Sequence, residues 1–171
     1  MNDDVRAVLG RLDALGIAYR FSEHAPTADM AACAGVDARL HALTPKNIFL
    51  TTKNGRHFYL CLTRPGARFR TADISKQAGS SRLSFAPEAD LARLLRCRGG
   101  SASPLGLLFD ADRAVGLLVD QALRDEPELG FHPCDNRYTV ALAGRDFFET
   151  FLPGLGVAPI WVEIHDFYDE A

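Results

Sequence analysis

Three short segments carry the polar residues that could do chemistry. The first is Lys46-Asn47, before an apolar run, where an ammonium group can reach over a pocket rim and meet a phosphate. The second is the loop 99–106, whose glycines let the backbone approach a ligand and whose serine hydroxyls can bond either a ligand or the loop's own backbone. The third is the turn 132–136, which holds an imidazole, a carboxylate and an amide. Each segment also has a purely structural interpretation. Lys46 could be a solvated lysine at a strand end, the loop 99–106 could simply connect two strands, and His132 could be a turn histidine bonded to backbone.

Other kinds of site are weakly supported. Ser101 or Ser103 could be combined with His132 and Asp135 as a hydrolase triad, but the Gly-x-Ser-x-Gly pattern is absent. His132 and Asp135 are also so close in sequence that the carboxylate is poorly placed to orient the ring. The His, Cys and Asp residues near 132 and 165 give too few ligands for zinc, and no phosphate-binding loop or dinucleotide fingerprint occurs. We therefore expect no metal and no cofactor.

The elements that must position these segments follow from periodicity and capping. Helices are predicted at 2–16, with Asn2 as the cap, at 27–35, with Thr27 as the cap, at 72–78, from Pro87 past Leu95, and at 146–152. Strands are predicted at 17–21, 48–51, 58–62, 82–85, 105–109, 115–119, 138–142 and 160–164, and a loop at 130–136. Asn54-Gly55 predicts a type I′ turn in the central hairpin. Hairpins mixed with helices indicate an α+β fold with a mixed, barrel-like sheet.

Length and composition favour one globular domain over residues 1–171, since 47% of the residues are hydrophobic. No run approaches the roughly 18 apolar residues that a membrane span needs. The acidic N-terminus does not resemble a signal peptide, and the four cysteines are widely spaced, as reduced thiols are. We expect a cytoplasmic protein without a membrane partner.

The net charge of −3 hides an asymmetry along the chain. Residues 46–98 contain eleven Lys or Arg and only three Asp or Glu. This segment predicts one positive face aimed at an anion, unless its charges are scattered in space. The acidity of the remainder argues against coating long duplexes, so no DNA binding is expected, whereas a small footprint on one nucleic-acid end is compatible.

Taken together, the three segments resemble a known family. Residues 45–50 (Pro-Lys-Asn-Ile-Phe-Leu), 100–107 (Gly-Ser-Ala-Ser-Pro-Leu-Gly-Leu) and 131–136 (Phe-His-Pro-Cys-Asp-Asn) are similar to the three signature stretches of the YbaK/ProX-type prolyl-tRNA editing domains, in the same order. The likeness extends over nearly the whole chain, whose length matches the free-standing editing proteins. It implies a mixed, mostly antiparallel barrel-like sheet surrounded by helices, no metal, and hydrolysis in trans of mischarged tRNA, above all of alanyl-tRNA carrying the proline anticodon.

The resemblance also implies roles for particular residues. It assigns the catalytic site to Lys46, His132, Gly100 and Ser101, with Lys46 near the terminal adenosine. It assigns substrate binding to Asn47, Ala102, Ser103, Pro104, Gly106, Phe131, Asp135 and Asn136. Candidates for the phosphates of the tRNA acceptor stem are Lys53, Arg82, Arg93 and Arg96.

A size-sorting pocket is physically reasonable for such an enzyme. A synthetase pocket built for proline cannot exclude the smaller alanine, because the lost contacts are worth only about 1–3 kcal/mol. A second pocket that is too small for proline admits alanine and excludes proline, so it hydrolyses only the wrongly attached residue. Two alternatives stay open: a tRNA-binding module without catalysis, and a deacylase for cysteinyl- or seryl-tRNA. Docking on prolyl-tRNA synthetase also stays open.

Overall fold

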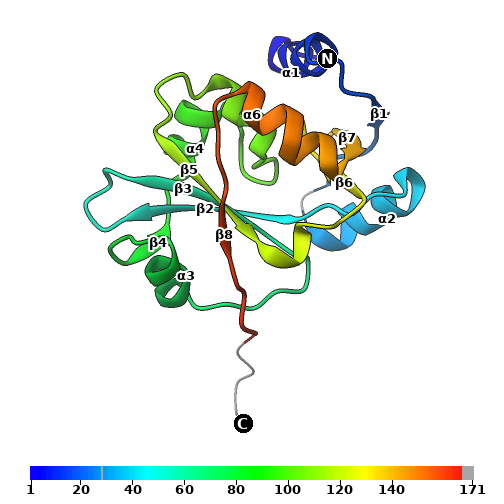
Figure 1. The fold of residues 1–171 in the computed structure, drawn as a ribbon. Helices are drawn as coiled ribbons and strands as arrows, with labels where there is room; N and C mark the ends of the chain where they lie inside the picture. Colours follow the sequence, from blue (N-terminus) through cyan, green and yellow to red (C-terminus); the bar gives the residue numbers. More distant parts are fainter. Residues whose placement is uncertain (28, 167–171) are drawn as a thin grey trace.

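The computed structural model describes residues 1–27 and 29–166, and its strands form two sheets (Figure 1). The smaller sheet has the order β1 (Tyr19–Glu23), β7 (Tyr138–Ala143), β6 (Glu128–Phe131). The larger has the order β4 (Leu83–Phe85), β2 (Lys46–Thr52), β3 (Phe58–Thr63), β5 (Val115–Asp120), β8 (Ile160–Val162). Four strand pairings are antiparallel and two are parallel. The predicted α+β class with mixed, mostly antiparallel strands is confirmed, but both sheets are open and form no closed barrel.

The two sheets are joined just before β2. The Leu43 N–H donates to the Glu128 carbonyl (3.0 Å), and the Gly130 N–H donates to the Leu43 carbonyl (2.9 Å). A Cβ at position 130 would lie 2.8 Å from Thr44 Oγ1, so glycine lets the two segments approach this closely. This contact brings the start of β2 beside the end of β6, although about 80 residues separate them in sequence.

Helices cover both faces of the larger sheet. The helical elements are α1 (Asp3–Ala14), α2 (Met30–Leu40), α3 (Thr71–Gln77), α4 (Glu88–Leu95), the 3-10 helices η1 (Pro104–Phe109) and η2 (Gln121–Leu123), and a continuous run 144–154 formed by α5 (Gly144–Asp146), the π-helical turn η3 (Phe147–Phe151) and α6 (Leu152–Gly154). The main core joins α1, α4, η1 and the run 144–154 to both sheets, with Phe131 against Phe147 at 4.7 Å between ring centroids. A second core lies under α3. Within the described residues, no helix is long and apolar enough to cross a membrane.

The apolar run 105–109 is a 3-10 helix rather than the predicted strand. Pro104 begins η1, and the Ser103 hydroxyl caps it by accepting from the Leu105 N–H (3.1 Å). Proline with φ near −60° after an extended residue suits a first helical position as well as a turn. Because a short buried apolar run has no periodicity, the sequence could not distinguish the two structures.

Other predictions need smaller corrections. The cap of α2 is Asp29 rather than Thr27, and the helix continues beyond Gly35 to Leu40. The predicted loop 130–136 begins inside strand β6, because Gly130 pairs with Ala141. The helix predicted at 146–152 extends in both directions, to 144–154, and β1 lies two residues later than predicted.

The central hairpin is confirmed, but its turn type is not. Only Gly55 in the turn has a positive φ, of 66°, whereas a type I′ turn needs one at Asn54 as well. The Gly55 N–H donates to the Thr52 carbonyl (2.8 Å), and the Asn54 side chain accepts from the Arg56 N–H (3.0 Å). The longer connection between Thr52 and Phe58 removes the need for a two-residue turn.

Candidate active site

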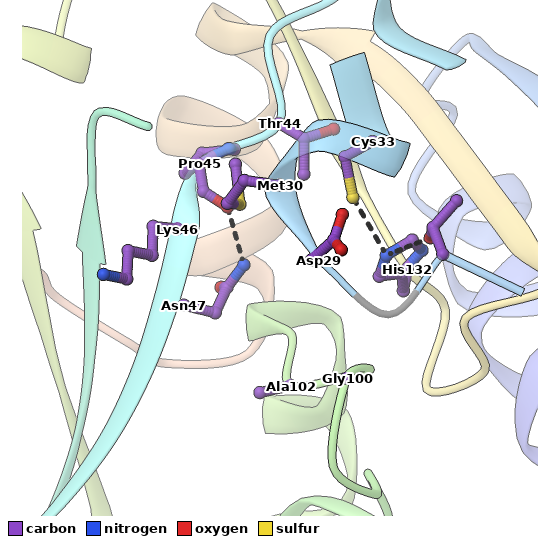
Figure 2. Close-up of a pocket in the computed structure, with 11 residues that line it drawn as sticks. Asp29, Met30, Cys33, Thr44, Pro45, Lys46, Asn47, Gly100, Ala102 and His132 are labelled. Atoms are coloured by element: carbon purple, nitrogen blue, oxygen red, sulfur yellow. Dashed lines mark hydrogen bonds between the residues drawn. The ribbon is translucent and has the colours of Figure 1, made fainter. Parts of the chain in front are cut away.

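The three predicted segments meet at one cavity of about 310 Å³ (Figure 2). Lys46 and Asn47 come from the start of β2, Gly100 and Ala102 from the loop between α4 and η1, and His132 from the turn after β6. The other lining residues come from α2 and the segments before α2 and β2: Thr27, Asp29, Met30, Cys33, Thr44 and Pro45. A volume of this size is at the small end of ligand pockets.

His132 closes one end of the cavity. The ring is 7% exposed, and its Nδ1–H donates to the Tyr138 carbonyl (2.8 Å), which leaves Nε2 as an acceptor. Nε2 accepts from the Thr27 hydroxyl (3.2 Å) and lies 3.8 Å from Cys33 Sγ. Burial lowers the pKa of His132 below its usual 6.5, so the ring is neutral at pH 7. The histidine is therefore both bonded to backbone, as a turn histidine is, and a wall of the cavity.

Lys46 lies at the opposite, open end. Its side chain is exposed and extends away from His132, with Asn47 and Asp29 between them (Figure 2). No acidic side chain in the described part of the chain pairs with its ammonium group. Asn47 Nδ2 donates to the Pro45 carbonyl (3.0 Å), while Asn47 Oδ1 is shielded from solvent and has no partner among the described residues.

The serine loop divides its residues between the cavity and the interior. Gly100, with a φ of 80°, and Ala102 line the cavity, but Ser101 is 3% exposed and is not part of the lining. The Ser101 hydroxyl accepts from the Arg98 N–H (2.9 Å) and lies 3.3 Å from the Cys134 carbonyl, to which it can donate. Ser101 thus ties this loop to the turn of His132. Ser103, fully buried, caps η1.

Four more predicted substrate-binding residues lie outside the cavity lining. Phe131 is in the core, and Pro104 and Gly106 are buried in η1. A Cβ on Gly106 would lie 2.5 Å from the Leu95 carbonyl, so this glycine permits packing of η1 on α4. The Asp135 carboxylate pairs with Arg137 (2.6 Å), whose hydrogen bonds lower the pKa of Asp135.

Asn136 also stays outside the cavity but supports it. Its carbonyl accepts from the Thr27 N–H (3.1 Å), and its Nδ2 donates to the Thr27 carbonyl (3.4 Å). Among the described residues, no Ser–His–Asp arrangement forms, because Asp135 bonds Arg137 and His132 Nδ1 bonds backbone. No three His, Cys, Asp or Glu side chains between 1 and 27 or 29 and 166 gather as metal ligands would.

Sequence reasoning missed the contribution of α2. Asp29 caps this helix by accepting from the Ala32 N–H (2.8 Å), which presents Met30 and Cys33 to the cavity. Thr44 is held by Asp37 of the same helix, which accepts from the Thr44 N–H (2.9 Å). Burial raises the pKa of the Cys33 thiol, so it is protonated at neutral pH. A capping Asp before an alanine-rich helix was the available signal.

The predicted phosphate ligands are spread over the surface. Arg82 lines a second cavity that Lys46 also lines, and Lys53 is at the exposed tip of the hairpin. Arg93 pairs with Asp90 (2.8 Å). Arg96 pairs with Asp4 (3.0 Å) and lies over the Phe109 ring.

Comparison with known proteins supports a translation-related function. A family model described as "Aminoacyl-tRNA editing domain" matches residues 23–150. The chain is 32% identical over 144 residues to the "Prolyl-tRNA editing protein ProX" of Acetoanaerobium sticklandii, covering 84% of this chain and 88% of that protein. It is also 32% identical over 162 residues to the bovine (Bos taurus) "Prolyl-tRNA synthetase associated domain-containing protein 1", covering 92% and 94%.

The fold has a solved counterpart. A crystal structure described as a candidate trans-editing enzyme for prolyl-tRNA synthetase superposes with a TM-score of 0.72 at 16% identity. The match covers 98% of this chain and 99% of that one. At this identity the likeness concerns the fold.

Proposed function

Because the chain belongs to the aminoacyl-tRNA editing domain family, and is thus a hydrolase acting on mischarged tRNA, we propose that it removes alanine from tRNA carrying the proline anticodon. The aminoacyl ester would lie in the cavity between Lys46 and His132. The observation that carries this proposal is the meeting of Lys46, Gly100, Ala102 and His132 at one cavity of about 310 Å³.

The reaction needs little from the protein beyond positioning and charge stabilisation. Water attacks the carbonyl carbon, the bond between that carbon and the ribose oxygen breaks, and the ribose oxygen takes a proton. The products are free alanine and uncharged tRNA. Since an ester is already activated, oriented donors and a placed water supply a useful share of the rate.

The loop around Gly100 is suited to the oxyanion. The N–H groups of its neighbours are engaged, since Gly99 donates to Glu88 (2.8 Å) and Ser101 donates to the Arg98 carbonyl (2.9 Å). In the part of the chain that the structure describes, no group accepts from the Gly100 or Ala102 N–H. These two backbone donors are therefore assigned to the negative charge that develops on the carbonyl oxygen.

Neutral His132 is assigned to the attacking water. A lowered pKa makes the ring a weak base. Its unprotonated Nε2 accepts a hydrogen bond from water, and so orients it, when the Thr27 hydroxyl that now bonds Nε2 (3.2 Å) donates instead to the Asn136 carbonyl (3.3 Å). Lys46 at the open end is assigned to a phosphate of the terminal nucleotides. Asn47, whose Oδ1 lacks a partner, is assigned to a donor on the substrate, once substrate binding exposes that oxygen.

The direct test is hydrolysis of a panel of aminoacyl-tRNAs. Alanyl-tRNA should lose its ester faster with the protein than without it, and prolyl-tRNA should decay at the uncatalysed rate. Preferential cleavage of cysteinyl- or seryl-tRNA would replace alanine as the substrate. Unchanged decay of every ester would reject catalysis.

A further inference from the structure

A second cavity, of about 590 Å³, adjoins the candidate active site. The described residues that line it include four basic side chains and no acidic one: Lys46, Arg68, Arg70 and Arg82. Phe85, the last residue of β4, lies at its rim with 75% of its surface exposed. The ring therefore offers an open aromatic face to a ligand, and the cations beside it favour an anionic one.

A hollow of about 310 Å³ connects this cavity to the active site. It shares Lys46, Asn47 and Ala102 with the site of His132. It shares Lys46, Ile48 and Phe85 with the basic cavity. The three hollows therefore adjoin one another in a line from His132, past Lys46 and Phe85, to Arg82, and we call this line of hollows the track.

Two of the charges along the track, those of Lys46 and Arg82, are available to a ligand. Neither Lys46 nor Arg82 has an ion pair with another described residue. Glu88 is the acidic residue at the connecting hollow, and its carboxylate accepts from the Gly99 N–H (2.8 Å), which holds the catalytic loop beside the track.

We propose that this track binds the single-stranded 3′ end of the tRNA, with one base stacked on Phe85 and the preceding phosphates at Arg68 and Arg82. This inference rests on the proposed function, because the ester must enter the cavity of His132. Aromatic platforms beside cationic grooves are the usual way to hold single-stranded RNA. A duplex presents no open base face, so the platform selects the unpaired end over the acceptor stem.

The test is binding of an uncharged RNA hairpin that ends in unpaired CCA, compared with the same hairpin ending blunt. Wild-type protein should bind the CCA hairpin more tightly, and Phe85→Ala should weaken that binding about tenfold while leaving the blunt hairpin unaffected. Phe85→Trp should restore it. Arg82→Ala should lower the slope of log affinity against log salt by about 0.7, the value for one phosphate of a single strand.

Ile160→Ala is the matched control. Ile160 is an exposed apolar residue (38%) on β8, at the opposite edge of the same sheet from β4, and its loss should not alter RNA binding. Equal binding of the CCA hairpin by wild type and Phe85→Ala would overturn the inference. The inference would also be overturned if wild-type protein bound the blunt hairpin as tightly as the hairpin that ends in CCA.

Hydrolysis assays keep the two proposals separate. Alanyl-tRNA cleavage that does not respond to Phe85→Ala overturns the stacking platform and leaves the editing proposal intact. Phe85-dependent RNA binding without cleavage of any ester overturns editing alone.

Discussion

The two ends of the candidate active site are built differently. At the His132 end, both ring nitrogens have protein partners, and the ring is 7% exposed. At the Lys46 end, the ammonium group is exposed and no described residue pairs with it. The closed end fixes the shape of the cavity, and the open end keeps a charge available for a ligand. Substitutions at the two ends should therefore fail in different ways.

The largest effect on activity is expected at the open end. Lys46→Ala should reduce kcat/KM for alanyl-tRNA by about 100-fold, because a hydrogen bond to a charged phosphate is worth about 1.5–3 kcal/mol. Its melting temperature should match wild type, because substitutions of exposed side chains change stability by about 0.5 kcal/mol or less. Lys76→Ala, on the exposed surface of α3, is the matched control. Equal turnover of Lys46→Ala and wild type would remove Lys46 from the mechanism.

The closed end should lose stability together with activity. His132→Ala leaves the Tyr138 carbonyl and the Thr27 hydroxyl without their ring partner, at a cost of about 1–3 kcal/mol in the free energy of unfolding. Urea denaturation and single-turnover hydrolysis measure the two losses. His165→Ala, an exposed histidine near the C-terminus, should change neither. A fully stable but inactive His132→Ala would show that the ring acts only in chemistry.

Residue types made the three segments candidates, but each segment alone also had a structural interpretation, and only their joint resemblance to the editing-domain signatures combined them into one predicted site. Lys46 begins a buried strand, and His132 stands beside a proline in a turn, so both were recognisable as candidates. Their meeting depends on the bridge between Leu43 and Leu129, a contact between residues far apart in sequence. No local pattern encodes that pairing, so sequence periodicity alone could not place them together.

The serines show the opposite limit of sequence reasoning. The sequence allowed the Ser101 and Ser103 hydroxyls to bond either a ligand or the backbone of their own loop, and in the structure both bond the loop and the helix that contain them. Serine in a tight turn competes for nearby backbone groups, and which partner it takes depends on the folded loop. The α2 residues were missed for a related reason, since Met30 and Cys33 are ordinary helix residues until tertiary packing turns them toward the cavity.

A smaller effect separates positioning from nucleophilic catalysis. Ser101→Ala removes hydrogen bonds to Arg98 and Cys134 and should cost about 1 kcal/mol in the free energy of unfolding. Hydrolysis per folded molecule should persist at a reduced rate, and no acyl-enzyme should accumulate in wild type when alanyl-tRNA is mixed with excess protein. A trapped acyl group on Ser101 would instead establish a serine hydrolase.

The smallest expected effect is in the dependence of stability on pH. Because burial lowers the pKa of His132 below 6.5, the unfolded chain binds a proton at a pH where the folded ring does not. The stability due to neutral His132 is thus fully present above pH 6.5 and decreases as the pH falls toward its folded pKa. Over that interval the slope of the free energy of unfolding against pH approaches about 1.4 kcal/mol per pH unit.

Urea titrations of wild type and His132→Gln between pH 8 and pH 5 measure how far the pH dependence of the two unfolding free energies differs. His24, whose ring centroid lies 6.2 Å from that of His132, is present in both proteins. If the unfolding free energies of the two proteins changed with pH in parallel, protonation of the buried ring would cost no folding stability. The closed end would then tolerate a charge as readily as the open end does.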